Sequence, residues 1–327
     1  DLFMKLEEIH QIAVLGAGLM GHGIAQSFIA GGYPVILYDI QESVLDSAAA
    51  HIKNSLELFC GAGLIESKDI DPALDRLTCT VDLKRAVAGA EFITEAIPED
   101  LALKQDIFQR VEDLCRPEAI LASNTSSLTL EAIGAKVQNK QRLVTTHWFN
   151  PPQLVPTVEV VRGKETSDET FTGAYDLLLK IGKVPVKINR ELPGFLVNRV
   201  QIAMVREVLD LFEQGIASAE DIDRAIKGSI GFRLASIGPM LTMDLGGLQL
   251  WLKVMENLLP RIRSATEPPE TLKRLVSQGH TGIRSGQGFY NYSADGSEGA
   301  VEAAIRKRDR EFLQRLKNLY RESETGK

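Results

Sequence analysis

Residues 12–21 read Ile-Ala-Val-Leu-Gly-Ala-Gly-Leu-Met-Gly, an apolar run that leads directly into a G-x-G-x-x-G loop. The pattern predicts a buried strand, a tight turn and the start of a helix, as in sheets that bind dinucleotides. Gly16 would permit the tight turn, Gly18 would let a pyrophosphate approach the backbone, and Gly21 would let the helix pack on the strand. A glycine-rich turn in some other α/β protein is the alternative interpretation.

An acidic residue follows the second strand-like run, and it bears on whether the cofactor is NAD or NADP. Asp39 follows Val-Ile-Leu-Tyr and stands eighteen residues after Gly21. A carboxylate at this position accepts hydrogen bonds from ribose hydroxyls. No Lys or Arg occurs from 40 to 46 to receive a 2′-phosphate, so we expect NAD rather than NADP. Leu19 and Met20, inside the glycine loop, would also line the cofactor.

Around this loop, short β-type runs alternate with helical stretches. Strands are expected over 11–15, 34–38, 92–97, 119–122, 143–148, 158–161 and 184–188, and helices over stretches such as 19–30, 103–115 and 169–181. This alternation predicts a Rossmann-type, doubly wound α/β sheet.

Beyond the boundary near 190–193, nearly everything from Phe195 onward is helical in pattern. We therefore expect an NAD-binding domain over 1–190 and an all-α C-terminal domain over 191–327. We expect the second domain to end in a charged amphipathic helix over 301–321.

Charge and composition exclude several classes of protein. The 327 residues carry a formal net charge of −7 and a pI near 5.4, so the composition lacks the excess of positive charge typical of nucleic-acid-binding proteins. No apolar run is long enough for a membrane span, and the N-terminus resembles neither a signal peptide nor an arginine-rich transit peptide. A presequence removed before Asp1 stays open, since the chain does not begin with Met.

The cysteines and histidines indicate no metal site. Cys60, Cys79 and Cys115 are scattered, as are the five histidines, and neither set has metal-ligand spacing. Unpaired cysteines in odd number are typical of a reducing compartment. We expect a cytoplasmic enzyme with a small-molecule substrate, no metal, and no nucleic-acid or membrane partner.

The stretch His147-Trp148-Phe149-Asn150-Pro151-Pro152 suggests the chemistry. His147 ends a β-branched apolar run, the double proline stops that strand, and the next run, 157–161, brings back Glu159. Two adjacent strands would set the carboxylate against the imidazole. Such a pair is a general base whose tautomer is fixed and whose protonated form is stabilised. A merely structural histidine is the alternative.

With these pieces in place, the chain resembles the L-3-hydroxyacyl-CoA dehydrogenase family over almost its whole length. The matching segments are 16–21, Glu95-Ala96-Ile97-Pro98-Glu99 with Lys104, 123–127 (Ser-Asn-Thr-Ser-Ser), 147–152 with Glu159, 193–199 (Pro-Gly-Phe-Leu-Val-Asn-Arg) and 286–290 (Gly-Gln-Gly-Phe-Tyr). Several separate motifs in the right order are far more specific than any one of them. The resemblance also implies a homodimer, with the helical domain serving substrate binding and dimerisation.

The resemblance implies a role for each site residue. His147 would take the proton of the substrate's 3-hydroxyl while the hydride leaves C3 for the nicotinamide, and Glu159 would orient His147. Ser126 and Asn198 would hydrogen-bond the reacting oxygens. The residues implied near the cofactor are Glu99, Lys104, Asn150 and Ser126. Ser126 and Ser127 could instead cap a helix that starts near Leu128.

Two departures from the family pattern concern the substrate. The helix after the second strand carries Lys53 but lacks the lysine cluster that often meets the phosphates of coenzyme A. The longer turn over 231–239 resembles the branch that holds lambda-crystallin (L-gulonate 3-dehydrogenase), carnitine dehydrogenase and a pyridoxine-degradation dehydrogenase. Arg233 in that turn would then clamp a substrate carboxylate, or else form an ordinary ion pair.

The aromatic pair before Asn150 is closer to the acyl-CoA enzymes. We therefore expect NAD-dependent oxidation of a short-chain L-3-hydroxyacyl-CoA, or the reverse reaction. The same chemistry on a small free hydroxy acid is the alternative.

Overall fold

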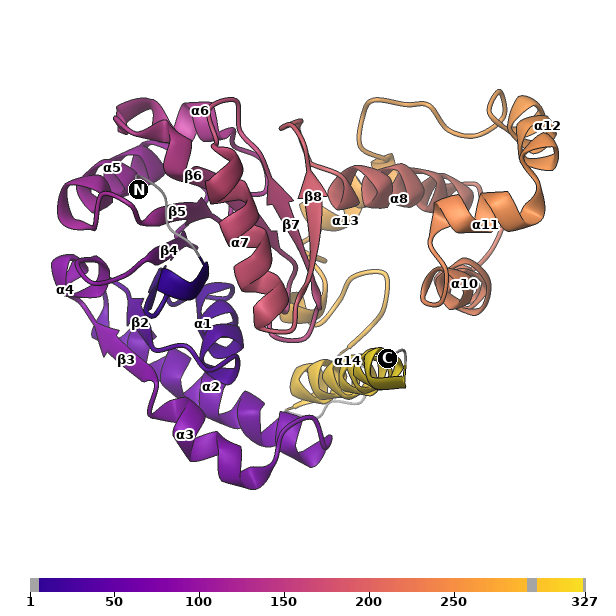
Figure 1. The fold of residues 1–327 in the computed structure, drawn as a ribbon. Coiled ribbons are helices and arrows are strands. Elements are labelled where there is room, and N and C mark those ends of the chain that lie inside the picture. The colour runs from indigo at the N-terminus through magenta and orange to yellow at the C-terminus, as the bar shows by residue number, and fades with distance from the viewer. Residues whose placement is uncertain (1–5, 293–298, 326–327) are drawn as a thin grey trace. The chain divides into compact units, whose positions relative to one another are not determined.

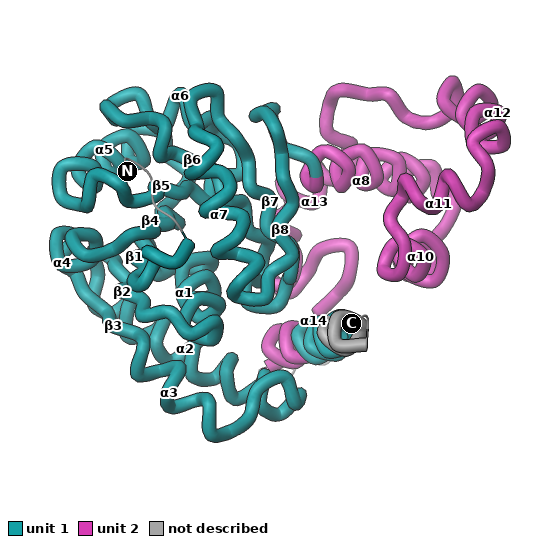
Figure 2. The backbone as a smooth tube through the Cα atoms, in the orientation of Figure 1, with its two compact units in different colours: residues 1–196, 307–327 teal, residues 197–306 magenta. Residues whose placement is uncertain are grey.

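The computed structural model describes residues 6–292 and 299–325. The chain divides into two compact units (Figure 2). Unit 1 comprises Asp1–Leu196 together with Lys307–Lys327, and unit 2 comprises Val197–Arg306.

Unit 1 is built on one eight-stranded sheet with the order β3-β2-β1-β4-β5-β6-β7-β8. The strands are β1 (Ile12–Leu15), β2 (Val35–Tyr38), β3 (Leu77–Thr80), β4 (Phe92–Glu95), β5 (Ile120–Ser123), β6 (Leu143–Trp148), β7 (Thr157–Val161) and β8 (Val184–Ile188). Every neighbouring pair is parallel except β6 and β7, which are antiparallel. The chain moves outward from β1 through β2 to β3 and then returns to the other side of β1 at β4, so the order reverses between β1 and β4. The predicted doubly wound sheet is confirmed, and ligands bind such sheets at this reversal point.

Helices cover both faces of the sheet (Figure 1). One apolar layer contains side chains of α1 (Gly21–Ala30), α2 (Glu42–Gly61) and α7 (Asp168–Lys180), packed on one set of strand residues. The opposite layer contains side chains of α4 (Leu83–Val87), α5 (Leu101–Leu114) and α6 (Leu130–Ile133). Successive strand residues serve opposite layers, because side chains alternate across a strand. The remaining short elements of unit 1 are α3 (Ile70–Leu74) and the 3-10 turns Leu6–Glu8, Ser67–Asp69, Gly134–Lys136 and Lys140–Arg142.

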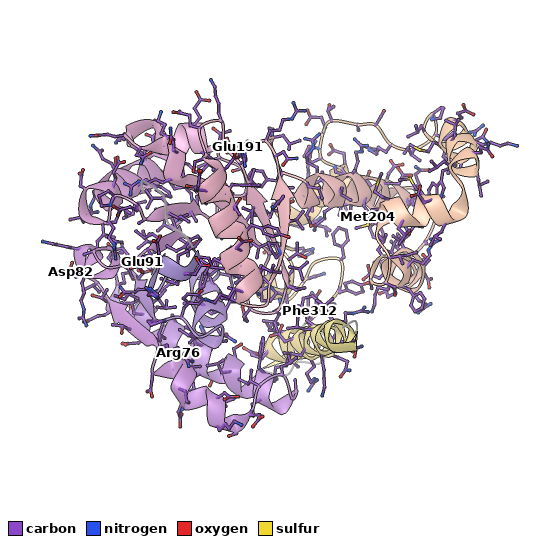
Figure 3. All side chains as sticks on the ribbon, in the orientation of Figure 1. Arg76, Asp82, Glu91, Glu191, Met204 and Phe312 are labelled. Atoms are coloured by element: carbon purple, nitrogen blue, oxygen red, sulfur yellow. The ribbon has the colours of Figure 1, made fainter. Side chains whose placement is uncertain are left out.

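Several of these helices begin where the sequence provides a capping side chain. Asp82, labelled in Figure 3, accepts a hydrogen bond from the N–H of Arg85 at the start of α4. Asp100 starts α5 in the same way, and Ser167 starts α7. Each cap satisfies an N–H group that the first helical turn leaves without a partner.

Strand β3 was not predicted. Its sequence, Leu77-Thr78-Cys79-Thr80, is short and only half apolar, and three of its four residues are half-buried. It lies at the edge of the sheet, where one side of a strand has no strand neighbour. Such strands lack the continuous apolar run by which buried parallel strands are recognised.

The last helix also departs from the predicted domains. In α14 (Ala300–Thr325), Leu313 and Leu316 are buried, and Lys317 Nζ donates a hydrogen bond of 3.0 Å to the carbonyl of Ala62. The part from Lys307 onward therefore belongs to unit 1, whereas the sequence placed it in the helical domain. Phe312, labelled in Figure 3, is half-buried on the same helix. The first boundary lies after Leu196, a few residues beyond the predicted one.

Unit 2 is all-helical, as predicted. It contains α8 (Val197–Glu213), α9 (Ala219–Ile226), a π-helical turn (Lys227–Gly231), α10 (Phe232–Leu234), α11 (Pro239–Gly246), α12 (Leu248–Leu258), α13 (Glu270–Ser277), the 3-10 turn Ile283–Ser285 and the start of α14. Many large apolar side chains of this unit are more than a third exposed, among them Val200, Ile202, Phe232, Met240, Leu245, Leu248, Leu250 and Leu252. Across the described parts of both units, no helix has the length and apolar character needed to cross a membrane.

Candidate active site

The loop between β1 and α1 is shaped by its glycines. Gly16 has a φ of 95°, and a Cβ on it would lie 2.7 Å from the carbonyl oxygen of Ala96. A Cβ on Gly21 would overlap the carbonyl oxygen of Gly16, whereas a Cβ on Gly18 would meet nothing within 4 Å. Packing therefore requires the first and third glycines, and the second faces open space where a phosphate can approach the backbone.

The N-terminus of α1 lies directly behind this loop. The helix begins at Gly21 with Met20 at the N-cap position, and no side chain caps it. Leu19 is 56% exposed. The N–H groups of the first turn and the positive end of the helix dipole form an anion-binding end at the point where the strand order reverses. This geometry fits the pyrophosphate of a dinucleotide.

Asp39 stands at the carboxyl end of β2 beside the same loop. Its Oδ2 accepts a hydrogen bond of 2.9 Å from the N–H of Ala17, and its Oδ1 accepts one of 3.2 Å from the N–H of Gln41. The carboxylate is half-buried, so it fixes the glycine loop and still has capacity to accept hydrogen bonds from ribose hydroxyls.

His147 and Glu159 face each other across the antiparallel pair β6–β7. His147 Nδ1 lies 2.8 Å from Glu159 Oε2, and the two residues are 5% and 0% exposed. The sequence predicted this contact from the two neighbouring strands. When Nδ1–H donates to the carboxylate, Nε2 carries the lone pair, and the imidazolium that forms on protonation is stabilised.

Two aromatic rings hold the imidazole of His147. The ring centroid of Phe149 lies 4.7 Å away and that of Phe195 lies 5.4 Å away. Phe195 is buried with a φ of 46°, a strained conformation for a residue other than glycine. The next residue, Leu196, donates its N–H to Glu159 Oε1 at 3.0 Å, so the carboxylate helps to hold this strained turn.

Glu99 clamps the loop that carries Ser126. Its Oε1 accepts hydrogen bonds from Thr125 Oγ1, from the N–H groups of Ser126 and Ser127, and from Ser127 Oγ, at 2.5 to 3.2 Å. Burial alone would raise the pKa of Glu99, but the hydrogen bond from Thr125 and the charge of Lys104 outweigh it and lower the pKa. Ser126 itself is exposed, on a loop with a fixed backbone.

The helix predicted to start near Leu128 is present as α6, but the alternative that Ser126 and Ser127 cap it is wrong. Helix α6 begins at Leu130, and Thr129 caps it by accepting from the N–H of Ala132. Glu191, labelled in Figure 3, accepts a second hydrogen bond at this end, from the N–H of Leu130. The hydroxyl of Ser126 is therefore not used for capping.

Lys104 lies beneath the Glu99 clamp and is 1% exposed. Its Nζ is 2.6 Å from Glu95 Oε1 and 3.2 Å from Glu99 Oε2. Glu95 also accepts hydrogen bonds from Ser123 Oγ and from the N–H of Ile97. Burial raises the pKa of the Glu95 carboxyl, and the Lys104 ammonium opposes that shift. Lys104 thus contacts Glu99 from the protein interior, and its amine is buried rather than open to solvent.

The turn after β6 carries Asn150, which is exposed. The Asn150–Pro151 peptide bond is cis. The strand end before this turn is tied to the serine loop, because Asn124 Oδ1 accepts a hydrogen bond of 2.9 Å from the N–H of Trp148. Asn150 and the serine loop thus both follow sheet strands at the carboxyl edge, where the glycine loop also lies.

The two remaining predicted site residues belong to unit 2. Asn198 is the second residue of α8 and is half-buried, three residues along the chain from Phe195. Arg233 is the middle residue of α10 and is exposed. Unit 1 brings together the glycine loop, Asp39, the clamp and the His147–Glu159 pair, and Asn198 and Arg233 lie in the other unit.

The sequence reading assigned no role to three residues that shape the site: Glu95, Asn124 and Phe195. Glu95 carries a recognisable signal, since it is a charged residue at the end of the apolar strand β4, where it must find a buried partner. The roles of Asn124 and Phe195 depend on loop conformation, which leaves no periodic pattern. In the described residues, no group of three or more His, Cys, Asp or Glu side chains is arranged to hold a metal ion.

Comparison with known proteins agrees with this geometry. Residues 11–191 match the family model of the 3-hydroxyacyl-CoA dehydrogenase NAD binding domain, and residues 194–292 match that of the 3-hydroxyacyl-CoA dehydrogenase C-terminal domain. Helix α14 lies beyond the second matched range.

Curated relatives match along nearly the whole chain. A 5-formyl-3-hydroxy-2-methylpyridine 4-carboxylate 5-dehydrogenase of Mesorhizobium japonicum is 30% identical, covering 91% of this chain and 96% of its own. A probable 3-hydroxybutyryl-CoA dehydrogenase of Bacillus subtilis is 35% identical, covering 87% and 98%. The crystal structure of a dehydrogenase of the pyridine carboxylate type, described as an NAD⁺-dependent dismutase, superposes with a TM-score of 0.87 at 29% identity, covering 95% and 99%. This chain therefore belongs to the 3-hydroxyacyl-CoA dehydrogenase family of NAD-dependent oxidoreductases.

Proposed function

We propose that this protein transfers a hydride between NAD and the hydroxyl-bearing carbon of a small substrate, with His147 as the general base. The observation that carries the proposal is the buried contact between His147 Nδ1 and Glu159 Oε2, in the same sheet as the glycine loop. In the oxidising direction, His147 Nε2 takes the hydroxyl proton and Glu159 stabilises the imidazolium. NAD supplies the hydride acceptor when bound.

The other residues of the site position the reactants. Ser126 and Asn198 would donate hydrogen bonds to the reacting oxygen, and Glu99 would keep the Ser126 loop in place. Gly16, Gly18, Leu19, Met20, Gly21 and Asp39 would hold the dinucleotide, with Glu99, Lys104 and Asn150 near its nicotinamide end. The buried position of Lys104 supports an indirect role for this residue, through Glu99.

For the substrate, we propose a short-chain L-3-hydroxyacyl-CoA, which would be oxidised to the 3-keto form or produced in the reverse direction. Matches to both domain models of the 3-hydroxyacyl-CoA dehydrogenases and the 35% identity to a probable 3-hydroxybutyryl-CoA dehydrogenase support this class. The aromatic pair Trp148-Phe149 before Asn150 agrees with it.

A second candidate is a small free carboxylate, and specific observations favour it. The match to the pyridine carboxylate dehydrogenase structure covers 95% of this chain. Helix α2 carries Lys53 as its one Lys or Arg, and the segment after it has three acidic residues, Glu66, Asp69 and Asp71, against Lys68, which pairs with Glu66. Such a surface is unfavourable for the phosphates of coenzyme A. Arg233 would then pair with the substrate carboxylate.

We also propose that the protein is a homodimer formed through unit 2. The support is the set of large apolar side chains exposed on α8, α11 and α12, since exposed apolar side chains in such number are typical of interfaces. Sedimentation equilibrium of the full chain would test this, and a monomer at micromolar concentration would contradict it.

A substrate panel tests the function. We expect NADH oxidation with acetoacetyl-CoA under the first proposal. Under the second we expect turnover of L-gulonate, carnitine or the pyridine carboxylate, and no competition by free coenzyme A. The His147→Gln variant should bind NADH normally and lose about 10²- to 10⁴-fold in turnover. His10→Gln, which changes an exposed histidine, is the matched control. Near-normal turnover by His147→Gln would rule out His147 as the base.

A further inference from the structure

The turn that follows β6 is held by a buried lysine from a distant part of the chain. Lys183 Nζ donates hydrogen bonds to the carbonyl of Pro152 at 2.6 Å and to that of Val155 at 3.2 Å. The residue is 7% exposed, and its amine lies 5.2 Å from the ring centroid of Trp148. One side chain therefore contacts both the end of the catalytic strand and the turn that carries Asn150.

The chain directs this lysine inward by local geometry. Gly182, just after α7, has a φ of 79°, and the N–H of Lys183 bonds back to the carbonyl of Leu178. This is the usual way in which a glycine ends a helix and turns the chain. The following residue, Val184, begins β8 and is tied to Pro156. The side chain of Lys183 is thus fixed at its backbone end as well as at its amine.

The opposite side of the turn packs on the cofactor-binding helix. Gly23, in the first turn of α1, has no room for a side chain, because a Cβ there would lie 2.7 Å from Pro152 Cγ and even closer to Gln153 Oε1. Trp148 contacts the same helix through Phe28, at a centroid distance of 5.9 Å. The turn is therefore held between α1, which begins at the glycine loop, and Lys183.

Burying an amine here carries an energetic cost that a plain packing role would not require. No carboxylate pairs with Lys183 among the ion pairs of the described residues, and burial lowers its pKa to about 7. Its hydrogen bonds go to backbone carbonyls, which any apolar side chain would leave unsatisfied. The amine thus donates hydrogen bonds to the carbonyls of the turn, although burial disfavours its charged form.

We propose that Lys183 is a positioning residue for hydride transfer. By fixing the turn over 150–155 against α1, it sets the place of Asn150 relative to His147 and to the nicotinamide end of the NAD site. This inference rests on the proposed role of His147, and it deepens that role by naming what aligns the base with the cofactor. A displacement of about 1 Å in such an arrangement can cost about 100-fold in rate.

The test uses Lys183→Met, which keeps the length of the side chain and removes its donors, and Lys183→Gln, which keeps an N–H₂ donor. We expect Lys183→Met to raise the NADH dissociation constant several-fold and to lower kcat about 10- to 100-fold. The primary isotope effect with deuterated NADH should increase, because misalignment slows the hydride step itself. Lys183→Gln should restore part of each change.

Two controls separate positioning from loss of stability. Lys187→Met removes an exposed lysine of β8 that lies over Tyr175, and it should leave the NADH dissociation constant and the isotope effect unchanged. Val111→Ala in α5 removes buried methyl groups from the apolar layer on the opposite face of the sheet. Assayed well below its melting temperature, it should behave like the wild type.

Binding of NADH, followed by its fluorescence, does not depend on the substrate. If the wild type binds NADH but reduces no member of the substrate panel, the proposed function fails while the effect of Lys183→Met on NADH binding still tests this inference. Wild-type NADH affinity in Lys183→Met, with an unchanged isotope effect wherever turnover is measurable, would overturn it.

Discussion

Glu159 is bonded to Leu196 as well as to His147: Oε1 accepts the Leu196 N–H at 3.0 Å while Oε2 lies 2.8 Å from His147 Nδ1. The carboxylate therefore contacts both His147 and Leu196, the last residue before α8 begins. Each oxygen of this buried carboxylate has its own partner, so the group is held in one orientation against the imidazole. Orientation of His147 and the path of the chain into α8 depend on the same group.

This double contact predicts how Glu159→Gln will behave. The amide can still accept from Leu196 through its oxygen, and its N–H₂ then faces Nδ1 and favours the wrong tautomer of His147. We expect kcat to fall by about 10²- to 10⁴-fold, with little change in melting temperature. Glu159→Ala should lose both stability and activity. Steady-state kinetics and thermal denaturation of the two variants would check this, and a Glu159→Gln enzyme of normal kcat would contradict it.

The glycine loop offers a matched pair of substitutions. Gly18→Ala places a methyl group in open space, so the variant should fold and melt like the wild type. It should nevertheless bind NADH at least about tenfold more weakly, because the methyl group occupies the path of the pyrophosphate. Gly21→Ala overlaps the carbonyl of Gly16 and should lower the melting temperature as well. Equal NADH affinity for Gly18→Ala and the wild type would show that phosphate does not approach at this point.

Removing one partner of the buried Lys104–Glu95 pair should destabilise the fold more than replacing both partners with uncharged side chains. Lys104→Met leaves the Glu95 carboxylate in a site with 0% exposure, and we expect a loss of about 3–5 kcal/mol in unfolding free energy. The double variant Glu95→Gln with Lys104→Met should recover much of that loss. Chemical denaturation of both single variants and the double variant gives the coupling free energy, and strict additivity would mean that the two side chains do not interact.

Lys183 should make stability depend on pH. Its pKa is lowered by burial from 10.5 to about 7 in the folded protein, so between these values the unfolded chain binds more protons. The contribution of Lys183 to the unfolding free energy is highest above pH 10.5, declines as pH falls toward about 7, and is constant below that. The unfolding free energy of the wild type, relative to Lys183→Met, should therefore rise between pH 7 and 10 by at most about 1.4 kcal/mol per unit. A pH-independent difference would mean that the amine is not desolvated.

Arg233 separates the two proposed substrate classes. If it binds a substrate carboxylate, Arg233→Met should raise KM for free carboxylates by about tenfold or more and leave NADH affinity unchanged. With acetoacetyl-CoA the same variant should behave like the wild type. Arg284→Met removes another exposed arginine of unit 2 and serves as the control. An equal effect of both substitutions would indicate a general effect of charge.

The sequence predicted those parts of the structure that rest on periodicity or on contacts between adjacent strands. The strand at residues 12–15 was recognised because burial on both faces produces a continuous apolar run. The His147–Glu159 contact followed from two neighbouring strands in the chain. Edge strand β3 was missed because it lacks that apolar run.

Contacts between loops could not be predicted in this way. The Glu99 clamp joins the loops after β4 and β5, and no spacing rule connects a carboxylate with N–H groups 27 and 28 residues away. The amphipathic pattern of 301–321 showed that the last helix has an apolar face, but it gave no information on what covers that face. Its membership in unit 1 depends on tertiary contacts alone, such as that of Lys317 with Ala62.

The return of α14 to unit 1 has a consequence for how the protein is made. Unit 2 is an insertion within unit 1, because residues on both sides of it in the chain belong to the same compact body. Leu313 and Leu316, which are buried, leave the ribosome after all of unit 2. The dinucleotide unit can therefore begin to fold early in translation, but it is completed only after the residues from Lys307 onward have been synthesised. A truncation that removed α14 would therefore remove buried leucines from unit 1.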